Sequence, residues 1–261
     1  MNPPCVAVEE LWVRYRQRRT PALADVTFTA DPGECLALIG PSGAGKSTLL
    51  AVLTGLIAPT RGDVRVAGEN LRGISVRSLR QLRQNIGLVS QRGDLVPSST
   101  LLANVALAVP GAPMSRSRRP DRARMAAAMA ALERLAVDDV AHARVDEVSG
   151  GQRQRAAVAR ILVRRPKLVL ADEPAASVDV HSAELVHDAL TQLSASGSTL
   201  IVATHDLTVL QRADRAVALA SGQLQFDQHI GQVDSIALQH LYAEERLEPP
   251  RAPMPVTSVR C

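Results

Sequence analysis

Aromatic residues are scarce in this 261-residue sequence, because Phe, Tyr and Trp together make up 2% of it. Proteins that bind nucleic acids commonly stack bases on aromatic rings, which this chain can hardly do. The excess of basic residues is also small, with 30 Lys and Arg against 26 Asp and Glu, although the isoelectric point is about 9.4. The concentrated basic run, from Arg116 to Arg124, lies in a Pro-containing stretch typical of a solvated linker. We therefore expect no nucleic-acid partner.

Long hydrophobic runs are missing as well. The best apolar stretch, residues 49–58, is much shorter than a bilayer requires and contains Thr54 and Gly55. The N-terminal MNPPCVAVEELW lacks the basic start and the apolar middle of a secretory signal. The sequence therefore predicts a cytoplasmic protein whose association with a membrane is peripheral.

Cysteines are few. Cys5, Cys35 and Cys261 cannot all pair with one another, and their positions show no metal-ligand spacing. We expect reduced thiols, which excludes the class of small folds held together by disulfides.

The hydrophobic fraction of 46% is sufficient for a globular core. Short apolar segments alternate with helical patterns, which predicts an α/β fold with a mainly parallel sheet. The expected strands are CLALIG, IGLVS, KLVLAD, TLIVAT and RAVALA. Two earlier segments, VAVEELWVRY and ALADVTFTA, follow each other without a helix between them and predict an antiparallel sheet at the edge of the core.

A helical insertion is expected in the middle of the chain, because residues 91–155 show no strand pattern and residues 123–135 show a helical one. We place it at about residues 92–157, inside one domain that covers residues 1–247. The remaining segment, 248–261, is rich in Pro and is predicted to be a flexible tail.

The segment GPSGAGKST, residues 40–48, has the spacing of a phosphate loop and stands between a predicted strand and a predicted helix. Backbone amides of such a loop surround the β-phosphate of a nucleotide, the lysine reaches the β- and γ-phosphates, and the following hydroxyl binds Mg²⁺. A simple Gly-rich turn would leave Lys46 without a purpose. The expected nucleotide contacts are Gly40, Pro41, Ser42, Gly43, Ala44, Gly45, Lys46, Ser47 and Thr48.

Two carboxylates end the apolar segment KLVLADEP, which is typical of a buried central strand. Open α/β sheets bind ligands at the carboxyl ends of their strands. We therefore expect Asp172 to hold Mg²⁺ and Glu173 to orient and deprotonate an attacking water.

The stretch DEVSGGQRQRAAVAR places Ser149, Gly150 and Gly151 at the start of a basic helix. The amides at a helix N-terminus suit an anion such as phosphate. An ordinary capped helix is the alternative for this segment taken alone.

Six separated motifs, taken together and in this order, resemble the nucleotide-binding subunit of ATP-binding-cassette (ABC) proteins over the chain up to about Leu247. VSGGQ is similar to the family's signature, although Val148 stands where Leu is usual. ASVD resembles the loop after the catalytic Glu, ATHD supplies the switch His205, and Gln91 follows a strand as the lid glutamine does. Tyr15 stands where the family keeps an aromatic residue for adenine. The resemblance implies a RecA-like phosphate-loop core and an ATPase that uses Mg²⁺.

In this family two copies face each other head to tail, and each ATP lies between the phosphate loop of one copy and the signature of the other. The resemblance therefore implies a homodimer with contacts made across the interface by Ser149, Gly150, Gly151, Gln152 and Asp179. It implies catalytic roles for Glu173, His205, Gln91 and Lys46, and metal ligation by Ser47, Gln91 and Asp172.

Three of these residues have ordinary structural alternatives. His205 could begin a helix without a catalytic role, Tyr15 could be an aromatic residue of an edge strand, and Gln91 could face solvent. Asp179 is expected to shape the dimer interface rather than to perform chemistry.

The resemblance further implies a transport ATPase that works with separate transmembrane subunits at the cytoplasmic face of the inner membrane. The segment QRGDLVPSSTLLANVALAV looks like an importer's docking loop, with Leu95, Val96 and Pro97 as candidate contacts and a solute-binding protein as an indirect partner. LVLADEPAASVD and DSIALQHLY are similar to the ATPases of phosphonate importers. Importers of phosphate esters or amino acids, lipoprotein-releasing exporters, soluble assembly ATPases and nucleic-acid-linked ABC ATPases are the alternatives.

Overall fold

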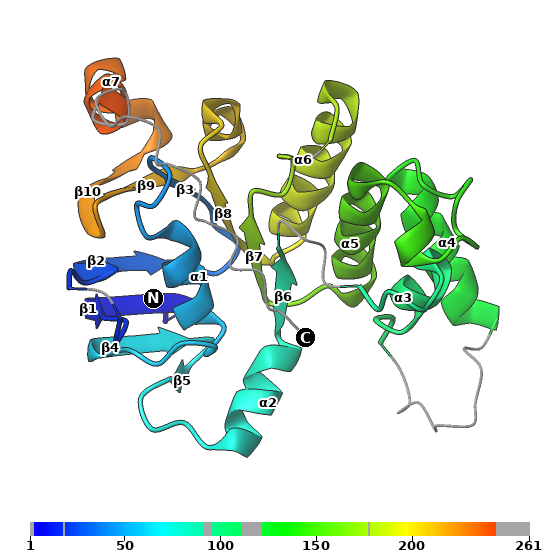
Figure 1. Cartoon of the computed structure of the whole chain (residues 1–261), viewed down its shortest axis with the longest axis horizontal. Coiled ribbons are helices and arrows are strands. Elements are labelled where there is room, and N and C mark those ends of the chain that lie inside the picture. The colour runs from blue at the N-terminus through cyan, green and yellow to red at the C-terminus, as the bar shows by residue number, and fades with distance from the viewer. Residues whose placement is uncertain (1–2, 18, 91–94, 111–121, 177, 244–261) are drawn as a thin grey trace, which may run out of the picture.

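The computed structural model describes residues 3–17, 19–90, 95–110, 122–176 and 178–243, and Figure 1 shows it as two sheets with helices around them. The smaller sheet is antiparallel, in the order β2-β1-β4-β5. Its strands are β1 (Val6–Val13), β2 (Leu23–Ala30), β4 (Arg61–Val66) and β5 (Glu69–Asn70). The predicted antiparallel sheet at the edge is thus confirmed, with two strands that the sequence had not indicated.

The larger sheet has the order β10-β9-β3-β8-β7-β6 and is parallel except for β10. All five strands that the apolar segments predicted belong to it. Its strands are β3 (Cys35–Ile39), β6 (Ile86–Val89), β7 (Leu168–Asp172), β8 (Thr199–Thr204), β9 (Arg215–Ala220) and β10 (Gln223–His229). Both β3 and β8 are buried along their whole length, as expected for parallel strands that are covered on both faces.

The two faces of the larger sheet belong to two hydrophobic cores, because successive side chains of a strand point in opposite directions. On β3, Leu36 and Leu38 face the antiparallel sheet and helix α1 (Lys46–Leu53), whereas Ala37 and Ile39 face the other helices. Helix α1 therefore lies between the two sheets (Figure 1).

Helices α3 (Leu101–Ala106), α4 (Arg122–Arg134) and the first part of α5 (Gly150–Arg164) pack against one another on the side of the larger sheet away from α1 (Figure 1). The short 3-10 helix η1 (Val145–Glu147) leads into α5. Helices therefore form the middle of the chain, as the sequence indicates. The domain limits 1–247 and 92–157 stay predictions, and the tail 248–261 lies outside the described residues.

Four further segments complete the described fold. They are α2 (Val76–Gln84), α6 (Val180–Ala195), η2 (Leu207–Arg212) and, near the C-terminus, η3 (Ile230–Gln232) with α7 (Ser235–Ala243). Helix α2 has a mostly polar sequence, and Ser75 precedes it as the N-cap, whose side chain accepts the amide of Ser78 at 3.0 Å. Within the described residues, no helix combines the length and the apolar character that a membrane crossing requires.

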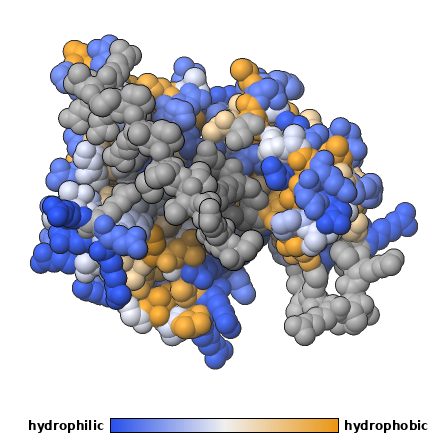
Figure 2. Space-filling model, in the orientation of Figure 1, coloured by the Kyte–Doolittle hydropathy of each residue, from blue (hydrophilic) through white to orange (hydrophobic). Residues whose placement is uncertain are grey.

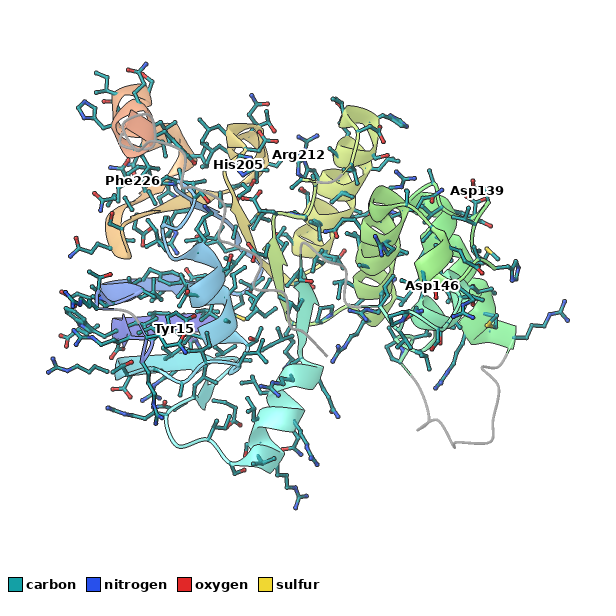
Figure 3. The ribbon with its side chains drawn as sticks, in the orientation of Figure 1. Tyr15, Asp139, Asp146, His205, Arg212 and Phe226 are labelled. Carbon is teal, nitrogen blue, oxygen red and sulfur yellow. The ribbon has the colours of Figure 1, made fainter. Side chains whose placement is uncertain are left out.

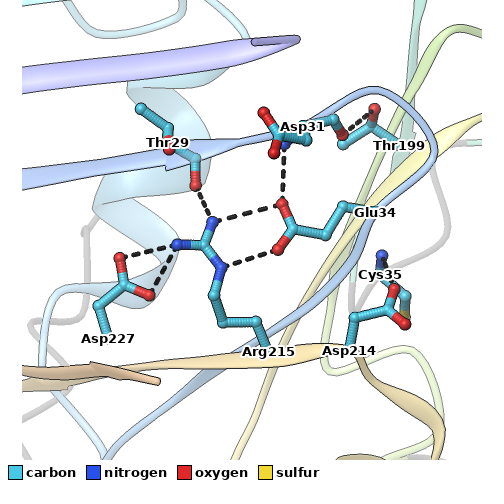
Figure 4. Close-up of polar contacts among 8 residues, drawn as sticks. All are labelled: Thr29, Asp31, Glu34, Cys35, Thr199, Asp214, Arg215 and Asp227. Carbon is cyan, nitrogen blue, oxygen red and sulfur yellow. Dashed lines mark hydrogen bonds and ion pairs between the residues drawn. The ribbon is translucent and has the colours of Figure 1, made fainter. Parts of the chain in front are cut away.

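The two sheets are joined by a network around Arg215, at the end of β3 opposite the phosphate loop (Figure 4). The guanidinium of Arg215 donates to Glu34 at 2.7 Å and to Asp227 at 2.8 Å, and it also contacts the carbonyl of Thr29 on β2. Burial raises the pKa of Asp227, and Arg215 opposes that rise. The network therefore depends on one cation between two largely buried carboxylates.

We expect Arg215→Met to lower the free energy of unfolding by about 3 kcal/mol, because it leaves Glu34 and Asp227 without their shared cation. For a chain of this size the thermal midpoint should fall by roughly 6 to 12 °C. The matched control is Arg72→Met, since Arg72 and Asp63 form an exposed pair at 3.9 Å that is worth less than about 1 kcal/mol. Equal effects of the two substitutions in differential scanning calorimetry would contradict this role.

Two cysteines lie in the described chain, and the structure has both as free thiols. Burial raises the pKa of Cys35 to about 12, with a further contribution from the nearby Asp214. Asp214 also accepts a hydrogen bond from the amide of Cys35 at 2.8 Å. Cys261 lies outside the described residues.

Candidate functional site

The predicted phosphate loop occupies the turn between β3 and α1. Gly45 caps the helix with a φ of 107°, in the left-handed region that favours glycine. The ammonium of Lys46 lies inside the loop, where it donates to the carbonyls of Gly40 at 2.6 Å and Pro41 at 3.1 Å. The Lys46 side chain is 8% exposed, so its charge is directed into the loop rather than into solvent.

The loop is packed so closely that two of its glycines have no room for a side chain. A Cβ on Gly40 would lie 2.0 Å from the carbonyl oxygen of Leu219, and one on Gly45 would lie 2.9 Å from that of Ala22. The loop therefore rests directly on the backbone of β9 and of the segment before β2.

Asp172, the last residue of β7, reaches the start of α1 across the site. Its carboxylate lies near the hydroxyl of Ser47 in the same pocket. Burial raises the pKa of Asp172, the neighbouring Glu173 adds to the rise, and the Ser47 hydroxyl and the charge of Lys46 oppose it. A hydroxyl and a carboxylate side by side are oxygen ligands of the kind that Mg²⁺ prefers, so these residues fit the predicted metal site.

Glu173 is held in a defined position by the end of β8. Its backbone adopts a φ of 49°, which is uncommon for a residue with a side chain. Its Oε2 accepts the hydroxyl hydrogen of Thr204 at 3.1 Å, and its Oε1 accepts the amide of His205 at 3.1 Å. The same Oε1 lies 2.8 Å from Nδ1 of His205. The structure therefore brings together the predicted base and the predicted switch histidine.

These groups line one open pocket of about 930 Å³, a size that suits a small-molecule ligand. The residues that line it are Thr20, Pro21, Ala22, Ser42, Gly43, Ala44, Gly45, Lys46, Ser47, Thr48, Asp172, Glu173, Ala176, His205, Ser221, Gly222 and Tyr242. The phosphate loop, the carboxylates and the histidine thus share a single cavity, although the loop lies more than a hundred residues before the other groups in the sequence.

The structure describes Tyr15 but not Gln91. The hydroxyl of Tyr15, just after β1, is 3.3 Å from Oγ1 of Thr48, and the ring is half-buried. Figure 3 shows Tyr15 near the antiparallel sheet and His205 near the end of β8, on opposite sides of α1 in this view. Gln91 lies outside the described residues, so its predicted roles are not tested.

The signature segment is not part of this pocket. The Ser149 hydroxyl caps α5 by accepting the amide of Gln152 at 3.2 Å, and the Gln152 side chain accepts the amide of Ser149 at 2.9 Å. Ser149 and Gly150 are exposed. Asp146, three residues before Ser149, lies among the helices at the far side of the molecule from Tyr15 and His205 (Figure 3). The capped-helix interpretation is confirmed, and it leaves the segment accessible to another molecule.

Asp179 begins α6 and is fixed by neighbours from two helices. It accepts the amide of Ser182 at 3.0 Å and the hydroxyl of Ser182 at 2.7 Å, which holds the pKa of Asp179 well down, at about 2. Arg155 of α5 approaches the same carboxylate at 3.9 Å and donates to the Ser182 hydroxyl. Arg155 therefore links the signature helix to the start of α6.

Sequence reasoning did not single out Arg155, which contacts Asp179, or Tyr242, which lines the pocket. Arg155 is one of several arginines in a basic helix, and its spacing does not distinguish it from Arg153 or Arg160. Tyr242 is one of the two tyrosines, but it lies 202 residues beyond Gly40, whose amide donates to its hydroxyl at 3.2 Å. Because aromatic residues are so scarce in this sequence, a tyrosine near the C-terminus was the signal that could have pointed to Tyr242.

The comparisons with known proteins agree with this geometry. The ABC transporter family model matches residues 23–176. A phosphonates import ATP-binding protein, PhnC, from Anaeromyxobacter dehalogenans is 41% identical over 246 residues, which cover 89% of this chain. The aligned region is 48% of that relative, so this chain spans about half of its length.

Two solved structures have the same fold over most of the chain. The ATP-binding cassette MJ0796, in a dimeric post-hydrolysis state bound to ADP and Pi, superposes with a TM-score of 0.79 at 30% identity, covering 86% of this chain and 98% of the other. The protein cbiO1 from Clostridium perfringens, part of the ABC transporter complex cbiONQ, gives a TM-score of 0.75 at 26% identity, covering 96% and 97%. With the phosphate loop, the paired carboxylates and the histidine in one pocket, the matches show that this chain belongs to the ABC transporter family.

Proposed function

We propose that the chain is the ATP-binding and ATP-hydrolysing subunit of an ABC transporter. Two copies would bind two ATP molecules between them, head to tail, and the cycle of closing and opening would drive separate membrane subunits. The observation that carries the proposal is the Glu173 carboxylate, fixed against His205 at the edge of the pocket that the phosphate loop forms.

Nucleotide binding follows from the phosphate loop. Lys46 would exchange its bonds to the carbonyls of Gly40 and Pro41 for phosphate oxygens, because charge-assisted bonds to phosphate are stronger than bonds to carbonyls. Ser47 and Asp172 would hold Mg²⁺, with Gln91 as a further ligand. Bound there, the metal neutralises charge that develops on the phosphates. Tyr15, at the Thr48 end of the loop, would stack on the adenine ring.

Glu173 and His205 would have separate roles in ATP hydrolysis. The Glu173 carboxylate would orient a water and accept its proton, which a positioned side chain can do efficiently. His205 would hold this carboxylate through its ring and its amide, so that Oε1 keeps its place near the phosphate loop.

Dimer formation is supported by the position of the signature segment. Ser149 and Gly150 are exposed at the N-terminus of α5, away from the pocket of their own chain. A helix N-terminus attracts anions, so the γ-phosphate bound by a second copy is a suitable ligand for Ser149, Gly150, Gly151 and Gln152. Asp179, at the start of the neighbouring helix, would line the same interface. The dimeric state of the ATP-binding cassette MJ0796 supports this arrangement.

A membrane partner is supported by the loop before α3. Leu95 is buried in the helical core, which corrects its expected role as a contact, whereas Val96 is 47% exposed. The buried Asn104 fixes this loop, because its side chain accepts the Val96 amide at 2.7 Å and donates to the Val96 carbonyl at 3.2 Å. Val96 and Pro97 therefore remain candidate contacts. Figure 2 shows further apolar side chains gathered beside α2 on one face of the molecule.

A phosphonate or a related small solute is the proposed cargo, which a solute-binding protein would deliver on the other side of the membrane. The similarity to the phosphonates import ATP-binding protein supports this choice. The chain would act at the cytoplasmic face of the inner membrane. A soluble ABC ATPase of an assembly scaffold and a lipoprotein-releasing exporter are the alternatives that the experiment must separate.

The test is co-purification from detergent-solubilised membranes of the native host, with the tagged chain and a non-hydrolysable ATP analogue. We expect a protein with several membrane spans and a solute-binding protein, whose ligand would identify the cargo. The matched control is Val96→Asp, which should lose the membrane protein and keep nucleotide binding. Recovery of soluble partners alone would reject the transport role and leave the ATPase chemistry untouched.

A further inference from the structure

The phosphate loop is enclosed by parts of the chain that lie far from it in the sequence. Gly222, in the turn between β9 and β10, donates to the carbonyl of Ala44 at 3.0 Å and accepts the amide of Ala24 at 2.8 Å. At the other end of the loop, the amide of Gly40 donates to the Tyr242 hydroxyl at 3.2 Å. The C-terminal part of the described chain therefore holds both ends of the loop.

Helix α7 brings Tyr242 to this position by ordinary packing. Leu241 is 6% exposed and belongs to the core that covers one face of the larger sheet, and Leu238 packs against the same core. Ile236, by contrast, is 58% exposed on the same helix. The apolar side of α7 therefore fixes the helix, and the Tyr242 hydroxyl extends beyond it into the wall of the nucleotide pocket.

The contact with Tyr242 adds to other contacts that restrict the backbone of Gly40. Its Cα faces the carbonyl of Leu219 so closely that a Cβ could not fit, and its φ is 148°. Its carbonyl receives the Lys46 ammonium at 2.6 Å. A loop that is already ordered before the nucleotide arrives loses less conformational entropy on binding, which strengthens the affinity.

We propose that Tyr242 is a positioning residue for nucleotide binding, through which helix α7 keeps the phosphate loop in its binding conformation. This inference rests on the proposed ATPase function and adds a contribution from the C-terminal helix. The phenol acts through the amide of Gly40 and has no part in the chemistry. Its effect is therefore expected on the affinity for the nucleotide and not on turnover at saturation.

Tyr242→Phe tests the role, because it keeps the ring and its packing and removes the hydroxyl. One hydrogen bond to a backbone amide corresponds to a change of about three- to tenfold in an equilibrium constant. We expect the Kd for ADP, measured by isothermal titration calorimetry, and the KM for ATP to rise by about that factor. The kcat at saturating ATP should stay within about twofold of the wild type.

Two other variants of α7 separate positioning from packing. Leu241→Ala should weaken the attachment of the helix, lower the thermal midpoint and raise the Kd for ADP in the same direction. Ile236→Ala, on the exposed side of the same helix, should change none of these quantities. An unchanged Kd in Tyr242→Phe, with normal ADP binding by the wild type, would reject the role of Tyr242 alone. Absence of ADP binding by the wild type would instead reject the proposed function.

Discussion

Glu173→Gln should reduce the kcat for ATP hydrolysis by about a thousandfold and leave the affinity for ATP close to that of the wild type. The amide cannot accept a proton from water, and a positioned general base contributes about a hundred- to ten-thousandfold to a rate. The new side chain can keep the geometry of the site, because its oxygen can still accept the His205 amide that now lies 3.1 Å from Oε1. The Thr204 hydroxyl can rotate to accept from the new NH₂ group.

The same variant tests the proposed dimer, because bound ATP that is not hydrolysed would keep two copies together. We expect Glu173→Gln with ATP to elute as a dimer in size-exclusion chromatography and with ADP as a monomer. Phosphate release measures turnover in parallel. The control is Glu184→Gln on the exposed side of α6, which should match the wild type in both assays. A monomer with ATP would count against the head-to-tail sandwich, and normal turnover would count against Glu173 as the base.

Most of the nucleotide pocket could be predicted from the sequence because its parts are short local motifs. The phosphate loop needs only the strand before it and the helix after it, and the ends of parallel strands meet at one edge of the sheet. Asp172, Glu173 and His205 therefore came together as expected from β7 and β8. The parallel sheet itself followed from apolar segments that are buried on both faces.

What the sequence did not indicate depends on polar segments and on distant contacts. Strands β4 and β5 are short and have few apolar residues, so their periodicity gives a weak signal. Helix α2 is amphipathic but mostly polar, so it does not stand out as a core element. Tyr242 meets Gly40 only because α7 packs on the sheet after the last strand. The signature segment raised a different difficulty, since a capped helix and an anion site need the same residues. In the structure the Ser149 hydroxyl accepts the amide of Gln152, while Ser149 and Gly150 stay exposed. The segment can therefore cap its helix and still be accessible to an anion.

Lys46→Ala should weaken nucleotide binding itself, with a Kd for ADP at least about thirtyfold higher than that of the wild type. Lys46 is 8% exposed and its ammonium lies inside the loop, so phosphate oxygens would meet it in a largely desolvated site. Removing one partner of a buried, hydrogen-bonded charge pair costs about 2 to 5 kcal/mol, and the lower figure already corresponds to roughly thirtyfold. Isothermal titration calorimetry with ADP measures this loss without interference from hydrolysis.

The sequence offers a close control, because Lys46 and Lys167 are its two lysines. Lys167 is exposed just before β7, at the opposite end of the sheet from the phosphate loop, so Lys167→Ala should bind ADP as the wild type does. Lys46→Ala also removes the donor to the carbonyls of Gly40 and Pro41, which can loosen the loop without any effect on charge. Lys46→Arg separates these effects, since it keeps the charge and changes the shape of the donor. If Lys46→Ala bound ADP as tightly as Lys167→Ala, Lys46 would not contact the nucleotide, and the assignment of the phosphate loop would be rejected.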